Sequence, residues 1–281
     1  MPFETNHAHS VTIACIQYEP KIGEVEANLN AIEERVREAH AKGARLIVLP
    51  ELADSGYVFD SVEELASLAQ PIPDGRSAQR LIALASEMDI YIVSGLAEVS
   101  SGVFYNSAML CGPEGYIGTY RKMHLWYREN LFFEKGDLGL PVFDTPLGRI
   151  GIAICYDGWF PETFRELAIK GAEVICVPTN WVPMPDQDPE AEAMSNILHK
   201  AAAHSNGLFI ACADRVGTER GQPFIGQSLI LDATGWPLAG PASREGEEIL
   251  YAEITPSDVL SKRRLNEFND KFGDRRTDVY G

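Results

Sequence analysis

Short apolar runs and longer amphipathic segments alternate along most of this chain. The apolar runs are rich in β-branched residues, as buried strands are, and the segments between them carry apolar residues every three or four positions, as helices do. Strands are predicted at residues 11–17, 45–49, 90–96, 106–110, 150–154, 173–177, 208–213, 228–232 and 249–254, and helices at 24–42, 77–88, 162–170, 189–206 and 257–264. This alternation predicts an α/β protein, and because no linker-like stretch divides it, a single domain over residues 1–281 is expected.

The apolar run at residues 150–154 leads directly into a cysteine, Cys155, and then into a predicted helix. Pro161 and Glu162 suit the first turn of that helix. A side chain at such a strand-to-helix turn stands above the sheet, close to backbone N–H groups that have no partner in the helix. A thiolate at this position can therefore attack a substrate while those N–H groups hold a negatively charged oxygen.

The remaining cysteines and the histidines have a plainer interpretation. A free cysteine in an apolar strand behaves as a small buried hydrophobe, and this is expected of Cys15, Cys111, Cys176 and Cys212. The odd number of cysteines, without close pairs, argues against a disulfide framework or a zinc site. His199 and His204 are five residues apart, which is the wrong spacing for two ligands on one helix face. We therefore expect no metal.

Charge and hydropathy exclude several classes of function. The formal net charge is −17 and lysine and arginine form no dense cluster, so no nucleic acid partner is expected. No apolar run approaches the ~20 residues that a membrane-spanning helix needs. The polar start at residues 1–10 lacks the basic and then apolar order of a signal peptide. These features predict a cytoplasmic protein that does not bind membranes.

Three predicted strand ends carry residues that can act together: Glu51, Lys122 and Cys155. A thiol with a pKa of ~8.5 is mostly protonated at neutral pH, so its use as a nucleophile needs a base or a nearby cation. Glu51 can serve as the base, and Lys122 can favour the thiolate and then hold the oxyanion. Taken singly, Glu51 is better interpreted as a helix or loop cap and Lys122 as a solvated charge, and only their joint order favours the catalytic interpretation.

Several short motifs follow one another along nearly the whole chain. They are Leu49-Pro50-Glu51 with Ser55-Gly56-Tyr57, Arg121-Lys122-Met123-His124-Leu125, Glu129 with Phe133 and Gly136, Cys155-Tyr156-Asp157 with Phe160-Pro161-Glu162, Gly226-Gln227-Ser228, and Arg275-Arg276-Thr277-Asp278-Val279-Tyr280. In this order and spacing they resemble the nitrilase superfamily of carbon–nitrogen hydrolases. The resemblance implies an α/β fold of a particular kind, a four-layer αββα sandwich.

The resemblance also implies a reaction and a role for each catalytic residue. Cys155 would attack an amide carbon while Glu51 takes its proton, and Lys122 with the backbone N–H of Tyr156 would hold the oxyanion. Glu129 matches a second glutamate that helps orient the lysine and the substrate. Release of ammonia would produce a thioester on the cysteine, which water then hydrolyses. No metal or organic cofactor is implied.

Within the resemblance, the residues after the cysteine favour a small neutral aliphatic or aromatic amide as substrate. True nitrilases usually have Trp-Glu where this chain has Tyr156-Asp157, and hydrolases of N-carbamoyl amino acids tend to have an arginine where it has Gly158 and Trp159. The alternatives are an N-carbamoyl amine hydrolase, such as an N-carbamoylputrescine amidase, a nitrilase, or a binding scaffold without activity. The pattern indicates equally a small apolar substrate pocket or ordinary aromatic core for five side chains, Tyr57, Trp126, Tyr156, Trp159 and Trp181. Asn180 and Trp181 form the pair that is most expected to bind the substrate.

The C-terminal tail and one predicted helix carry features that concern packing. Residues 265–281 are polar with few apolar positions, and by the resemblance this C-terminal tail is predicted to lie across a partner subunit in a homodimer or higher homo-oligomer. In the predicted helix at 189–206, an apolar stripe at helical spacing is predicted to pack inside the chain's own core; it consists of Met194, Ile197, Leu198 and Ala201.

Overall fold

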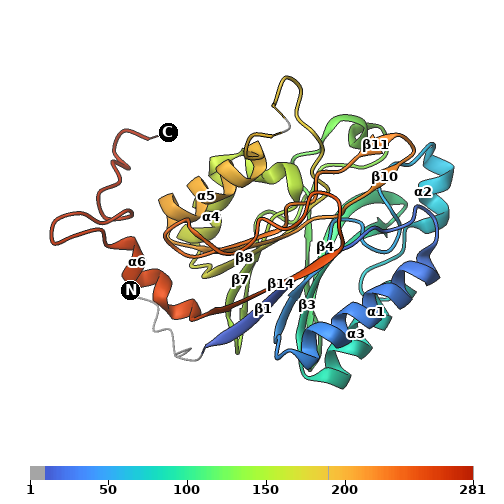
Figure 1. Ribbon diagram of the computed structural model, residues 1–281, viewed down its shortest axis with the longest axis horizontal. Coiled ribbons are helices and arrows are strands. Elements are labelled where there is room, and N and C mark those ends of the chain that lie inside the picture. Colours follow the sequence, from blue (N-terminus) through green and yellow to red (C-terminus); the bar gives the residue numbers. More distant parts are fainter. Residues whose placement is uncertain (1–9, 189, 281) are drawn as a thin grey trace.

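A computed structural model describes residues 10–188 and 190–280 of the chain. Most of the polar start at 1–10, and the first residue of the helix predicted at 189–206, lie outside the described residues. Within the described part, two mixed β-sheets face each other and helices cover the outer face of each (Figure 1). This arrangement confirms the predicted αββα sandwich. No helix among the described residues is long and apolar enough to cross a membrane.

The first sheet has the strand order β14-β1-β2-β3-β4-β5. Its strands are β14 (Glu248–Ile254), β1 (Val11–Gln17), β2 (Leu46–Val48), β3 (Tyr91–Ser100), β4 (Val103–Gly112) and β5 (Gly115–Arg121). Side chains alternate between its faces: Ile13 and Cys15 lie in the core between the sheets, whereas Ala14 and Ile16 lie under the helices. Those covering helices are α1 (Val25–Ala41) and α3 (Arg76–Met88).

The second sheet has the strand order β13-β12-β9-β8-β7-β6. Its strands are β13 (Pro237–Ala239), β12 (Leu229–Leu231), β9 (Phe209–Ala213), β8 (Val174–Pro178), β7 (Gly148–Ile152) and β6 (Val142–Thr145), and the helices over it are α4 (Pro161–Ile169) and α5 (Met194–Asn206). In its centre β7, β8 and β9 run parallel, as β1, β2 and β3 do in the first sheet. Parallel strands end at one edge of a sheet, and loops that follow them are brought together there.

Some short elements were not predicted from the sequence. They are α2 (Val62–Leu68), β6, β13 and a small hairpin of β10 (Thr218–Glu219) and β11 (Gln222–Pro223), and the longer strand β5 was not predicted either. The hairpin strands have two residues each, which is too short for a period-2 pattern to be visible. The predicted helix at 257–264 is divided into a 3-10 turn, Pro256–Asp258, and α6 (Val259–Arg263).

The prediction about α5 was wrong in its orientation. Met194 and Ile197 are 42% exposed, while the buried face carries mostly small and polar side chains: Ser195, Asn196, His199, Ala202, Ala203 and Asn206. Hydrogen bonds make this possible, because the His199 ring bonds the carbonyl of Ser195 and the Asn206 amide donates to that of Ala202. Hydrophobic periodicity alone therefore predicted the outer face of the helix as the buried one.

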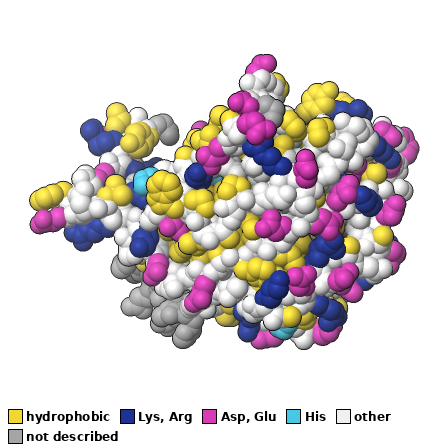
Figure 2. Space-filling model, viewed as in Figure 1, with side chains coloured by type: hydrophobic (Ala, Val, Ile, Leu, Met, Phe, Trp, Pro, Cys, Tyr) yellow, Lys and Arg dark blue, Asp and Glu magenta, His cyan; other side chains and the backbone are white. Residues whose placement is uncertain are grey.

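The C-terminal segment after α6 extends away from the two sheets (Figure 1). Figure 2 shows hydrophobic side chains on it beside basic and acidic ones, and Phe268 is 83% exposed. Over the rest of that view, acidic and basic side chains are interspersed. Most of the tail is thus exposed, although Phe272 packs against the core.

Candidate active site

The four residues predicted to be catalytic come from both sheets. Glu51 follows β2, and Lys122 follows β5 directly. Glu129 lies in a 3-10 helix, η1 (Tyr127–Leu131), and Cys155 opens another, η2 (Cys155–Trp159), just after β7. The structure brings Glu51, Lys122 and Glu129 into direct contact, and all four side chains are buried.

Lys122 holds this group together. Its ammonium nitrogen lies 2.7 Å from Glu51 Oε1 and 2.7 Å from Glu129 Oε1. Burial opposes the charge, but the carboxylates of Glu129 and Glu51 outweigh that effect and raise the pKa of Lys122 above its ordinary value. The lysine is therefore a fixed cation that donates hydrogen bonds, and it is not available to act as a base.

Glu129 is held from several directions. Its Oε1 accepts a hydrogen bond of 2.6 Å from the Tyr57 hydroxyl as well as that of Lys122, and its Oε2 accepts one of 3.0 Å from the backbone N–H of Trp126. Burial and the Glu129 charge keep the pKa of Tyr57 well above its usual value, so this phenol remains a donor. Tyr57, predicted to bind substrate, thus orients Glu129.

The two carboxyl oxygens of Glu51 differ in their hydrogen bonding. Oε1 accepts 2.7 Å hydrogen bonds from Lys122 and from the Asn106 side chain of β4, whereas Oε2 is buried without a hydrogen-bond partner among the described residues. Burial raises the pKa of Glu51 to about 7, and the Glu129 charge adds to this while Lys122 opposes it. A carboxyl with a pKa near neutrality can both accept and return a proton.

Cys155 adopts a strained backbone conformation. Its φ is 45°, in the left-handed region that residues other than glycine seldom occupy. Burial, followed by the charge of Glu51, raises the pKa of the thiol well above its ordinary value. The resting cysteine is therefore protonated at neutral pH, and it needs a base to become a nucleophile.

Asp157 stabilises the turn that presents Cys155. Its Oδ2 accepts hydrogen bonds from the Ile154 N–H at 2.9 Å and from the Tyr120 hydroxyl at 2.7 Å. Its Oδ1 lies 3.1 Å from the backbone nitrogen and 2.7 Å from the ring Nδ1 of His124. Because Tyr120 and His124 flank Lys122 in sequence, Asp157 connects the cysteine turn to the lysine segment.

Five of the six residues predicted to bind substrate line one small hollow beside Cys155. They are Trp126, Tyr156, Trp159, Asn180 and Trp181, joined by Val182 and Met184, which the sequence analysis did not identify. The hollow measures about 20 Å³. The side chain of Asn180 donates to the backbone carbonyl of Glu51 at 2.9 Å, which ties the loop after β8 to that after β2. Tyr57 lines a neighbouring hollow of about 60 Å³ instead.

Residues of two other motifs contact the segments that carry the site. Gly136 donates its N–H to the carbonyl of Lys122 at 2.8 Å, and a Cβ there would lie 2.0 Å from the carbonyl oxygen of Arg121, so only glycine fits. Ser228 contacts Gln17 of β1 and accepts a 2.9 Å bond from the N–H of Asp214. By contrast, the motif at 275–280 lies in the exposed tail, away from these contacts.

Three residues of the site, Asn106, Val182 and Met184, were not predicted from the sequence. Asn106 begins a predicted strand. A polar amide in an apolar run needs a hydrogen-bond partner when it is buried, and this could have indicated a residue of the site. Met184 follows β8 in an irregular loop, where no periodicity marks the side that faces the cysteine. Among residues 10–188 and 190–280, no group of His, Cys, Asp and Glu is arranged to hold a metal ion.

Comparison with known proteins agrees with this geometry. The family model for carbon-nitrogen hydrolases matches residues 12–264. The chain is 45% identical over 270 residues to a protein named nitrilase from Pyrococcus abyssi, covering 96% of this chain and 99% of that one. It is 33% identical to an N-carbamoylputrescine amidase from Solanum lycopersicum, covering 96% and 93%.

A solved structure shows the same fold. The carbon-nitrogen hydrolase from Helicobacter pylori G27 superimposes with a TM-score of 0.87 at 28% identity, covering 98% of each chain. The predicted resemblance is therefore confirmed over nearly the full length. The chain belongs to the carbon-nitrogen hydrolase family of the nitrilase superfamily and is a hydrolase acting on carbon–nitrogen bonds.

Proposed function

We propose that the protein hydrolyses a small neutral amide, aliphatic or aromatic, to the carboxylic acid and ammonia through a thioester on Cys155. The observation that carries this proposal is the composition of the hollow beside the thiol. Apart from Cys155 and Asn180 its walls are aromatic or aliphatic: Trp126, Tyr156, Trp159, Trp181, Val182 and Met184. Such walls suit an uncharged acyl group.

In the first half of the proposed reaction, the open Oε2 of Glu51 takes the thiol proton as Cys155 Sγ bonds to the amide carbon. The C=O π electrons move onto oxygen, and the Lys122 ammonium together with the N–H of Tyr156 stabilises that charge. At the start of a 3-10 helix such N–H groups are not used within the helix. The carbon–nitrogen bond then breaks as Glu51 returns its proton to the nitrogen, which leaves as ammonia.

In the second half, water replaces ammonia. Glu51, again ionised, takes a proton from water while the oxygen attacks the thioester carbon. The carbon–sulfur bond breaks, the thiolate recovers a proton from Glu51, and the acid departs. Each half uses one proton on one carboxyl, which agrees with a Glu51 pKa of about 7.

An N-carbamoyl amine hydrolase is the second candidate, favoured by the amidase from Solanum lycopersicum. Its reaction would release carbon dioxide as well as ammonia. The name of that relative implies a substrate with an ammonium group at its far end, and none of the residues that line the hollow beside Cys155 is a carboxylate. We therefore rank the neutral amide first. Nitrile hydrolysis, suggested by the name of the Pyrococcus abyssi relative, ranks third.

The test is ammonia release from matched amides, nitriles and N-carbamoyl amines. We expect turnover of the amides, and its loss in Cys155→Ala with an unchanged unfolding temperature. Cys111→Ala is the matched control, because Cys111 is a free buried cysteine in the core under α3. Ammonia from the carbamoyl compounds or the nitriles alone would replace the proposed substrate, and full activity in Cys155→Ala would refute the proposed nucleophile.

We also propose that the protein forms a homodimer through the outer face of α5 and the C-terminal tail. Met194 and Ile197 leave an apolar stripe exposed on the helix, and Leu265 and Phe268 are exposed on the tail. Exposed apolar surface of this kind is typical of protein–protein interfaces. Light scattering at micromolar concentration should give the mass of a dimer, and a monomer would refute the proposal.

A further inference from the structure

The hairpin of β10 and β11 contacts the loop that carries Tyr57 through Glu219. We propose that Arg215 and Glu219 are positioning residues for the reaction, which act through the Tyr57 hydroxyl to hold Glu129 and thereby Lys122 in place. The inference rests on the proposed use of Lys122 in stabilising the oxyanion.

Glu219 binds the backbone of the Tyr57 loop. Its Oε1 accepts hydrogen bonds from two successive N–H groups, that of Tyr57 at 2.8 Å and that of Val58 at 2.5 Å. A carboxylate that accepts from adjacent N–H groups fixes the direction of the peptide planes between them. The loop also approaches closely at Gly56, where a Cβ would lie 2.9 Å from Glu219 Oε2. The position of Tyr57 is therefore set by this carboxylate.

Arg215 in turn fixes Glu219. Its Nη1 donates to Glu219 Oε2 at 2.7 Å, and its Nη2 donates to the carbonyl of Pro20 at 3.0 Å. The guanidinium lies over the ring of Phe224, 4.1 Å from its centroid. Both charged side chains are almost completely buried. Because an ion pair removed from water is costly unless it is well bonded, the geometry of this pair is narrowly restricted.

A second contact from the same hairpin reinforces the first. The guanidinium of Arg220 donates to the carbonyl of Val58 at 2.8 Å and pairs with Glu64 and Asp60 beyond it. The hairpin thus holds one peptide segment by its N–H groups through Glu219 and by a C=O group through Arg220.

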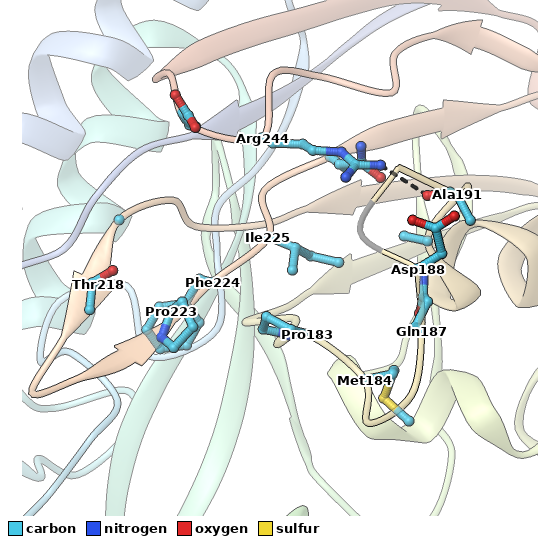
Figure 3. A pocket seen from close by; sticks show the side chains of 14 residues that line it. Pro183, Met184, Gln187, Asp188, Ala191, Thr218, Pro223, Phe224, Ile225 and Arg244 are labelled. Carbon is cyan, nitrogen blue, oxygen red and sulfur yellow. Dashed lines mark hydrogen bonds between the residues drawn. The ribbon is translucent and has the colours of Figure 1, made fainter.

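The hairpin also borders an open space. Figure 3 shows Thr218, Pro223 and Phe224 across a pocket from Pro183, and this pocket measures about 440 Å³. Little side-chain packing therefore supports the hairpin from that direction. The polar contacts of Arg215 and Glu219 carry the placement that packing would otherwise provide.

The Tyr57 side chain transmits this placement to the site. Its ring packs edge-on against Phe224, with centroids 5.8 Å apart, and its hydroxyl donates to Glu129 Oε1, which also binds Lys122. A displacement of the loop would release one of the bonds that orient Glu129. Since errors of about 1 Å in the position of a catalytic group cost up to ~100-fold in rate, the effect should fall on kcat.

The experiment is a double-mutant cycle with Tyr57→Phe and Glu219→Gln. The amide of the glutamine presents an N–H₂ either to Arg215 or to the two backbone N–H groups, so it cannot satisfy both sides as the carboxylate does. We expect each single variant to lower kcat about 10- to 100-fold while KM changes less than about 3-fold. In the Tyr57→Phe background, Glu219→Gln should cost little more, because the hydroxyl it positions is already absent.

The cycle is measured twice, on turnover and on the rate at which iodoacetamide alkylates Cys155, read by mass spectrometry. Alkylation needs no knowledge of the substrate, so coupling there without turnover of any amide would reject the proposed substrate and retain this inference. The control is Glu87→Gln, which removes the exposed partner of Arg37 and should change neither rate. If Glu219→Gln does not fold, Arg215→Lys takes its place. Additive losses, or an unchanged kcat in either single variant, would overturn the inference.

Discussion

The raised pKa of Glu51 predicts a specific pH dependence of activity. If Glu51 is the base, kcat/KM requires its ionised form and falls as pH drops through its pKa of about 7. At pH 5 about 1% of a carboxyl with that pKa is ionised, against about three quarters for one with the ordinary value of 4.5. The two cases therefore differ by roughly 75-fold in relative activity at pH 5. The shift means that ionising Glu51 at this fully buried position costs about 3 kcal/mol more than ionising a carboxyl with the ordinary pKa.

Two variants should move the acid limb in opposite directions. Asn106 donates a hydrogen bond to Glu51 Oε1 that favours the ionised form, so Asn106→Ala should shift the midpoint to higher pH, by roughly one unit. The charge of Glu129 raises the pKa of Glu51, so Glu129→Gln should shift the midpoint to lower pH. The midpoint can be compared between variants even where the maximal rate has fallen.

The assay is kcat/KM for a small amide between pH 5 and 9, with the pH dependence of Cys155 alkylation as a second readout. A midpoint between pH 4 and 5 in the unmodified protein would refute the argument that burial governs Glu51. Identical midpoints in the Asn106→Ala and Glu129→Gln variants would show that another group titrates.

Two further predictions concern packing and assembly. Gly158→Ala should lower activity strongly, because the new Cβ would lie 2.4 Å from Cε1 of the buried His199 and displace the cysteine turn, whereas Gly273→Ala, with its nearest atom at 3.5 Å, should leave activity unchanged in the same assay. Ile197→Asp places a charge on the exposed apolar face of α5 and should convert the proposed dimer to monomers in light scattering; an unaltered dimer mass would place the interface elsewhere.

Much of the fold was predictable because the long buried strands show their burial in their own sequence. The strand predicted at 11–17 is observed as Val11–Gln17, and its neighbours differ by a few residues at their ends. Strands buried on both faces are continuously apolar, and this is visible without knowledge of their partners. The four-layer arrangement came from the resemblance, because the order of strands in a sheet depends on contacts between residues far apart in sequence.

The site was predictable only in part, for a related reason. Glu51 and Cys155 follow predicted strands, whereas Lys122 follows β5, which was not predicted and pairs antiparallel with β4. Because β7 lies in the other sheet, the convergence of the three residues was predicted from the resemblance and not from strand geometry. The roles of Asn106 and Tyr57 could not be predicted, because each depends on one hydrogen bond between elements distant in the chain. The buried face of α5 was misjudged because polar side chains that bond their own helix can be buried as readily as apolar ones.

The protonated state of Cys155 also has a consequence for the survival of the enzyme in oxidising conditions. Peroxide attacks the thiolate, and its rate of attack on a thiol is far lower. Burial keeps the pKa of this thiol well above its usual value, so the resting protein exposes little thiolate to peroxide. In the proposed mechanism, the cysteine becomes reactive when Glu51 takes its proton during attack on a bound substrate. The environment that makes it dependent on a base therefore also protects it from inactivation between turnovers.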